Sequence, residues 1–151
     1  MVDVTAKPAT LRRAETRCVV TGIQRSIEQT VVRGHDDVLG AARVAGLQAA
    51  KITSHLIPLC HPLPLTRLSV EFSVHRDNIE VFAVAETVGQ TGVEMEALTA
   101  CTLAALAIIG AARDLDPEAS IERLTLWDKS GGQSGHWVRI DDDHVVADPN
   151  E

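Results

Sequence analysis

The chain has 151 residues, a formal net charge of −7 and three cysteines. One hydrophobic core commonly serves about 100 to 200 residues, so we expect a single domain over residues 1–151. The negative charge, with two Trp, two Phe and no Tyr, disfavours a general nucleic-acid binder. A phosphorylated ligand would therefore need a local cluster of cations, because the overall electrostatic potential of the chain repels anions.

The cysteines, Cys18, Cys60 and Cys101, are odd in number and lack CxxC spacing. This pattern disfavours a disulfide framework and a structural zinc site, so we expect no metal and a reducing compartment. The N-terminus lacks the apolar stretch of a signal peptide, and the longest apolar run, residues 103–112, is about half of a membrane span. We expect a cytoplasmic protein without membrane contact.

Hydrophobic periodicity organises the first half of the chain. Residues 1–14 are polar and predict an irregular basic arm, followed by a strand over 15–21 and a short helix over 26–32. Alanines at helical spacing predict a second helix from about residue 35 to Lys51. Three prolines in 56–65 exclude a helix interior or a central strand, so we expect an extended, stiffened segment that presents Cys60 and His61.

Alternating patterns over 67–75 and 79–87, separated by a turn at 76–78, predict a hairpin. Residues 92–113 are apolar nearly all round, which is typical of a buried helix and suggests packing against another subunit. Strands over 121–127 and 137–140 flank a glycine-rich loop at 130–135, and the acidic tail over 141–151 is expected to fray. Together these elements predict an α+β fold with helices on an antiparallel sheet.

Two short segments could carry chemistry. Cys60 and His61 indicate either proton transfer with phosphate contact, or a buried thiol and a hydrogen-bonded imidazole in a connector. Glu94 and Glu96 at a helix start either complement the helix dipole or place one carboxylate in a pocket. Only one of the two can face that pocket, because residues two apart on a helix point nearly opposite ways.

Two further groups could bind anions. The turn over 130–135 follows Lys129 and resembles an anion cradle, but it lacks the P-loop spacing and glycine turns between strands are common. Arg12, Arg43 and Lys51 are either a solvated set of cations or the phosphate-binding set that an acidic protein requires. The residues alone leave these alternatives open.

Five segments, taken in chain order, resemble the molybdenum cofactor biosynthesis protein C family, the cyclic pyranopterin monophosphate synthases. They are residues 1–7, 45–51, 56–63, 91–100 and 129–132. The resemblance implies a ferredoxin-like α+β subunit, assembled as a homo-oligomeric trimer of dimers with active sites at subunit interfaces. It also implies a small phosphorylated, nucleotide-derived substrate: cyclised dihydro-GTP is rearranged to cyclic pyranopterin monophosphate with loss of pyrophosphate, without a redox cofactor.

By matching position, the resemblance gives a ligand-binding role to Leu59, Cys60, His61, Met95 and Glu96, with Arg12, Lys51 and Lys129 as phosphate or purine contacts. Three catalytic positions differ from the family. Gly110 stands where the family has an aspartate, while Arg113 and His35 stand where it has lysines. Glycine offers no carboxylate, and arginine stays protonated at any workable pH.

Three hypotheses follow from this mixture. In the first, the chain is a synthase whose acid–base work falls on His35, His61 and Glu96, with Arg113 holding charge. In the second, the scaffold is redirected to a different cyclisation or rearrangement in specialised metabolism. In the third, the chain is a non-catalytic partner subunit, since fold alone does not settle function.

Overall fold

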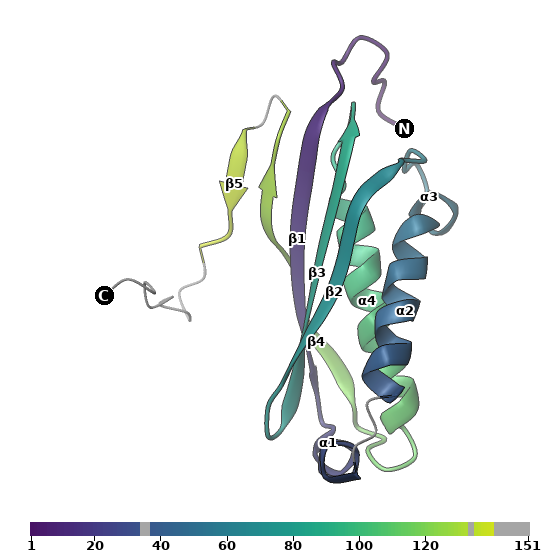
Figure 1. Cartoon of the computed structure of the whole chain (residues 1–151), viewed down its shortest axis with the longest axis vertical. Helices are drawn as coiled ribbons and strands as arrows, with labels where there is room; N and C mark the ends of the chain where they lie inside the picture. The colour runs from purple at the N-terminus through teal and green to yellow at the C-terminus, as the bar shows by residue number, and fades with distance from the viewer. Residues whose placement is uncertain (34–36, 133–134, 141–151) are drawn as a thin grey trace.

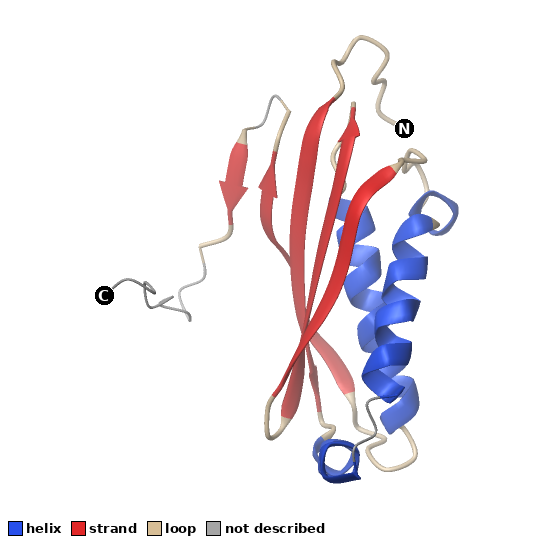
Figure 2. Ribbon diagram, viewed as in Figure 1, coloured by secondary structure: helices blue, strands red, loops and turns tan. Residues whose placement is uncertain are grey.

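The computed structural model describes residues 1–33, 37–132 and 135–140. A five-stranded antiparallel sheet is covered on one face by helices (Figure 1, Figure 2). The elements are β1 Thr10–Thr21, α1 Gln24–Arg33, α2 Asp37–Lys51, α3 Thr53–Leu56, β2 Leu65–Val74, β3 Asn78–Gly89, α4 Glu94–Ala112, β4 Ser120–Ser130 and β5 His136–Val138.

The strand order is β2-β3-β1-β4-β5, so β1 lies between β3 and β4. The chain runs from β1 through helices to the β2–β3 hairpin, then through α4 to β4, which is the split βαββαβ arrangement of ferredoxin-like folds. The short β5 extends the sheet beyond β4. The predicted α+β, ferredoxin-like fold is confirmed.

Strand alternation builds the core beneath α2 and α4. In β1, Ala14, Thr16, Cys18 and Val20 are buried under the helices, while Glu15, Arg17 and Val19 alternate with them and face the uncovered side. Gly46 brings α2 close to α4, because a Cβ there would lie 2.7 Å from the Ala100 carbonyl oxygen. Within the described residues, α4 is long and apolar enough to cross a membrane, yet half of it is buried in this core.

The prediction of an irregular arm over residues 1–14 is wrong for the last five of these residues. β1 begins at Thr10, and residues 10–14 pair with residues 85–89 of β3. The segment is polar because Arg12 and Arg13 face a cavity and an ion-paired surface rather than the core. Polar composition therefore hid the strand from hydrophobic periodicity.

The predicted extended segment over 56–65 is also wrong in part. Leu56 ends the single-turn helix α3, and a tight turn follows in which the Cys60 amide donates to the Ile57 carbonyl at 3.4 Å. Pro58 occupies the second position of the turn and Leu59 the third, with a φ of 69°. These are marks of a type II turn, so the prolines stiffen a turn here instead of an extended chain.

Several predicted boundaries shift by a few residues. The hairpin strands are Leu65–Val74 and Asn78–Gly89, the final strand is His136–Val138, and the helices predicted over 26–32 and 92–113 are Gln24–Arg33 and Glu94–Ala112. The larger change is at β4, which was expected to end at Trp127 but continues to Ser130. Lys129 is thus on a strand, and its pairing with Ala14 fixes the side of the sheet that it occupies.

Candidate functional site

A cavity of about 460 Å³ lies at the end of the sheet where β1 begins and β3 and β4 end, at the top of Figure 1. Its walls come from the N-terminal segment, the β3–α4 connection, the first turn of α4 and the glycine turn after β4. The lining residues are Lys7, Pro8, Thr10, Arg12, Arg13, Gln90, Thr91, Gly92, Glu94, Lys129, Ser130, Gly131, Gly132 and Gly135. The volume is within the range of small-molecule sites, about 300 to 1,000 Å³.

The cavity is cationic, although the chain as a whole is acidic. Among the described residues, Lys7, Arg12, Arg13 and Lys129 line it, against a single carboxylate from Glu94. A concave wall of one charge sign concentrates ions of the opposite sign. This is the local cluster of cations that a phosphorylated ligand requires in a protein of net charge −7.

Backbone carbonyls hold the Arg12 side chain in place. Its guanidinium donates from Nε to the Gly89 oxygen at 3.4 Å, from Nη1 to the Gly131 oxygen at 3.4 Å, and from Nη2 to the Gln90 oxygen at 3.5 Å. Gly132 lies flat against this group, since a Cβ there would overlap the guanidinium. The glycine turn therefore contributes one carbonyl, that of Gly131, to orient a cation, which differs from an anion cradle built of amide donors.

An ion pair closes one side of the cavity. Lys129 Nζ donates to Glu94 Oε1 at 3.3 Å, joining the end of β4 to the first turn of α4. The Glu94 carboxylate folds back against Gly92, where any side chain would overlap it. A glycine at this position is thus required for the pairing of Glu94 with Lys129.

Glu96 is in a different environment from Glu94. It is 4% exposed, and burial raises its pKa, with the negative charge of Glu94 acting in the same direction. Burial also raises the pKa of the Cys60 thiol, as does the charge of Glu96. Cys60 is therefore within electrostatic reach of Glu96, and both groups favour their protonated forms. Two nearby carboxyl groups whose environments push their pKa values apart are typical of acid–base sites.

The remaining members of the predicted binding set lie at this same end. Lys51 ends α2, Leu59 and His61 belong to the turn segment after α3, and Met95 is in the first turn of α4 (Figure 1). None of them lines the 460 Å³ cavity itself. Leu59 is 74% exposed and holds a left-handed conformation that is strained for a residue with a side chain. Such strain often accompanies a functional site.

Gly110 and Arg113 lie at the opposite end of the molecule. Seventeen residues of helix separate Arg113 from Glu96, which is about 25 Å at 1.5 Å per residue. Arg113 is exposed and pairs with Asp114 at 3.7 Å. His35 lies outside the described residues. The described part of one chain thus places Arg12 and Lys129 in the cavity wall. The other predicted binding residues lie towards the same end of the molecule without lining the cavity, and Gly110 and Arg113 lie at the opposite end.

Arg43 has a structural role, so its interpretation as a phosphate-binding cation is wrong. Its Nε donates to the Val70 carbonyl at 2.9 Å, and its guanidinium lies over the Phe72 ring at 5.4 Å and pairs with Glu71 at 3.7 Å. β2 is an edge strand, and a cation that occupies its free carbonyls protects that edge from further strand pairing.

Sequence reasoning missed five lining residues: Lys7, Pro8, Thr10, Arg13 and Gln90. The basic character of the N-terminal segment was the available signal for Lys7 and Arg13, but their placement depends on β1 beginning at Thr10. Gln90 fixes the segment through a hydrogen bond from its Nε2 to the Lys7 carbonyl at 2.9 Å. No sequence pattern indicates that contact across 83 residues.

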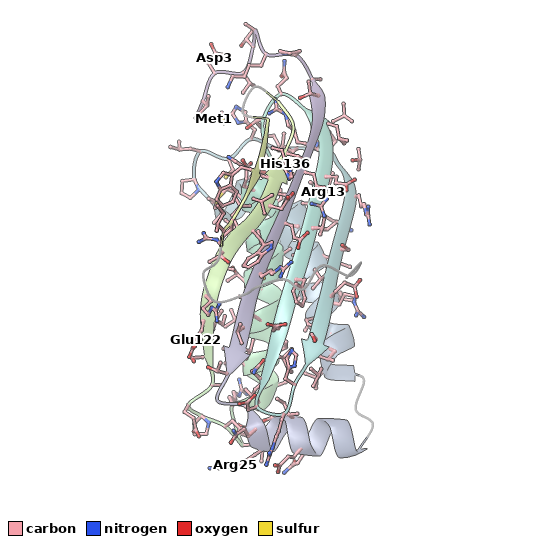
Figure 3. All side chains as sticks on the ribbon, turned by 90° about the vertical axis from the view of Figure 1, so that its left-hand side faces the viewer. Met1, Asp3, Arg13, Arg25, Glu122 and His136 are labelled. Carbon is pink, nitrogen blue, oxygen red and sulfur yellow. The ribbon has the colours of Figure 1, made fainter. Side chains whose placement is uncertain are left out.

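Arg13 links the cavity to the uncovered face of the sheet. It contacts Asp128 at 3.0 Å and Glu15 at 3.1 Å, and His136 lies 2.6 Å from the other Asp128 oxygen. Figure 3 shows Arg13 and His136 near one another towards the end of the molecule that holds the cavity. Because Arg13 is already paired with carboxylates, Lys7, Arg12 and Lys129 are the stronger candidates for anion contacts.

In the part of the chain that the structure describes, no three His, Cys, Asp or Glu side chains are close enough together to hold a metal ion. The chemistry available at this end of the molecule is therefore that of cations, two carboxyl groups, a thiol and an imidazole. This set can bind a polyanion and transfer protons.

The fold and the site define a ferredoxin-like α+β protein with a cationic cavity at the end of the sheet where α4 begins. The chain belongs to the MoaC family, whose model matches residues 1–132. A protein from Thermomicrobium roseum named cyclic pyranopterin monophosphate synthase is 47% identical over 148 residues, covering 95% of this chain and 89% of that protein. A protein of the same name from Trichodesmium erythraeum is 44% identical over 143 residues, covering 91% of this chain and 86% of that protein.

Proposed function

We propose that this chain is a cyclic pyranopterin monophosphate synthase, a lyase of molybdenum cofactor biosynthesis. Its substrate is a cyclised dihydro-GTP-type intermediate, and it works in the cytoplasm without a redox cofactor. The observation that carries the proposal is the cavity of about 460 Å³ lined by the cations Lys7, Arg12 and Lys129, at the end of the sheet where α4 begins and holds the buried Glu96 in its first turn. The names of relatives that share nearly half of its residues support the same activity.

In this proposal the cavity binds the triphosphate and stabilises the departing pyrophosphate. Lysine and arginine contacts offset the negative charge that accumulates on phosphoryl oxygens. Lys129 is paired with Glu94 in the free protein, so a phosphoryl group would compete with Glu94 for the ammonium. Arg12 is oriented in advance by three carbonyls, which lowers the entropy lost on binding.

Proton transfer is assigned to Glu96 and His61. The raised pKa of Glu96 keeps more of the carboxylic acid available near neutral pH, which suits a general acid. The raised pKa of Cys60 favours the thiol over the thiolate, so we assign Cys60 a binding role rather than a nucleophilic one. Leu59 and Met95 would contact the fused rings of the substrate.

We further propose that a second copy completes the site, within a trimer of dimers. The outer face of α4 exposes Met95 and Leu106, and no atom of the described residues lies within 4 Å of a Cβ built on Gly110, so another backbone can approach closely. The acidic first turn of α4 and Arg113 at its far end are complementary in charge. A two-fold axis perpendicular to α4 would set Arg113 of one copy beside Glu96 of the other.

One specific observation favours the redirected scaffold as a second candidate. Gly110 lacks the family's carboxylate and Arg113 cannot exchange protons as a lysine can. In this alternative the cavity retains a phosphorylated nucleotide derivative, but the reaction is a different cyclisation or rearrangement. A non-catalytic partner subunit would bind the ligand without any turnover.

The test is release of pyrophosphate when the purified full chain is supplied with the cyclised dihydro-GTP. The proposed function predicts turnover that is lost in Lys129→Ala. Binding without turnover contradicts it. In that event, a variant carrying His35→Lys, Gly110→Asp and Arg113→Lys separates the alternatives, because a redirected scaffold with an intact cavity should acquire synthase activity. Co-purification with an active paralogue would identify a partner subunit.

A further inference from the structure

One buried polar atom stands apart from the hydrogen-bond network. The Thr10 hydroxyl oxygen is shielded from solvent and, among the described residues, is the side-chain polar atom left buried without a hydrogen-bond partner. Buried hydroxyls almost always have partners, because desolvation without a replacement bond is unfavourable. An exception of this kind calls for a physical explanation.

Other buried threonines in this fold obey the rule. The Thr16 hydroxyl donates to the Ala97 carbonyl at 2.9 Å, the Thr53 hydroxyl to Ala50 at 3.0 Å and the Thr87 hydroxyl to Pro64 at 2.6 Å. These three threonines hold secondary-structure elements together, and none of them lines the cavity. Thr10, which does line the cavity, is the one whose hydroxyl is unsatisfied.

The position of Thr10 places it among the cations. It is the first residue of β1 and is two residues from Arg12, so the two side chains share one face of the strand. It pairs with Gly89, whose carbonyl accepts from Arg12. Lys7 and Gln90 complete this part of the wall.

We infer that Thr10 is a substrate-binding residue, whose hydroxyl donates a hydrogen bond to a phosphoryl oxygen when the cavity is filled. The inference rests on the proposed function. In the free protein the hydroxyl is closed off, and rotation about its Cα–Cβ bond between staggered rotamers turns it towards a ligand. Ligand binding then removes an unfavourable burial and adds a hydrogen bond to a charged acceptor.

The experiment compares Thr10→Val with the wild type, using inorganic pyrophosphate as the calorimetric probe and thermal unfolding as the second measurement. Valine keeps the shape and removes the hydroxyl. Pyrophosphate affinity should fall about tenfold, equivalent to about 1.4 kcal/mol, while the melting temperature should be no lower than that of the wild type. Thr10→Ser, which keeps the hydroxyl, should retain most of the affinity.

Thr16→Val is the matched control, because it removes a buried hydroxyl that has a partner. Its melting temperature should fall and its pyrophosphate affinity should stay at the wild-type value. Unchanged affinity in Thr10→Val, or a fall in its melting temperature as large as in Thr16→Val, would overturn the inference while leaving the proposed function intact. A wild-type chain that binds no pyrophosphate would overturn both.

Discussion

The glycine turn after β4 allows the role of Arg12 to be isolated by a pair of substitutions. Gly132 and Gly135 both have a φ in the left-handed region, at 70° and 65°. A Cβ at Gly132 would overlap the Arg12 guanidinium, whereas no atom in the described part of the chain lies within 4 Å of a Cβ at Gly135. Gly132→Ala and Gly135→Ala therefore carry the same backbone strain but differ in whether Arg12 must move.

The expected magnitudes follow from these contacts. An L-residue in the left-handed region costs roughly 1 to 2 kcal/mol, so both variants should lose stability by about that amount. The overlap at Gly132 adds little to this, because the displaced group is the end of a flexible side chain. Losing a charge-assisted contact from Arg12 to a phosphoryl group is worth about 1.5 to 3 kcal/mol. Pyrophosphate affinity should fall roughly 10- to 150-fold in Gly132→Ala alone.

Denaturant unfolding and calorimetric titration with pyrophosphate measure the two quantities separately. The reasoning requires similar unfolding free energies for the two variants and a large difference in affinity. Equal affinities in Gly132→Ala and Gly135→Ala would refute it, because the guanidinium would then have no part in anion binding.

Three further predictions concern stability. Gly46→Ala should destabilise the fold by about 2 kcal/mol or more, because its Cβ would overpack a backbone carbonyl of α4. Gly40→Ala on the same helix, where no atom of the described residues lies within 4 Å of the added Cβ, should stabilise the fold by about 0.5 to 1 kcal/mol, and urea unfolding compares the two variants. Since burial raises the pKa of Glu96 above its ordinary value of 4.5, the folded state loses stability as the pH rises through the folded pKa. Glu96→Gln should therefore gain stability relative to the wild type as the pH rises from below 4.5 through the folded pKa, and a stability difference that does not change with pH would contradict the raised pKa. Arg43→Ala removes the cap on the Val70 carbonyl at the β2 edge and should lower stability by about 1 kcal/mol and increase self-association in sedimentation, with no change in pyrophosphate affinity.

Much of the fold could be predicted because its core elements carry clear periodicity. The β2–β3 hairpin alternates, and α4 is apolar nearly all round because it packs between the sheet and α2. The predicted bounds of strands were wrong where the strand residues line the cavity. The start of β1 is polar because Arg12 and Arg13 leave the core, and β4 continues through Lys129 into the cavity wall.

The candidate site was predictable in part for the same reason. Family resemblance indicated Arg12, Glu96 and Lys129, and the structure brings all three to one end of the sheet. No sequence pattern marked Thr10 or Gln90 as a residue of the cavity. Their positions depend on the register between β1 and β3 and on contacts between residues about 80 positions apart. The turn at Leu59 was missed because a positive φ is unexpected for leucine.

The location of the substrate's phosphates tests the account most directly. A crystal structure of the full chain with bound cyclised dihydro-GTP should place the phosphoryl groups between Lys7, Arg12 and Lys129, with the Glu94 carboxylate displaced from Lys129. Phosphoryl density elsewhere on the molecule, with this cavity still empty and the ion pair intact, would contradict the account.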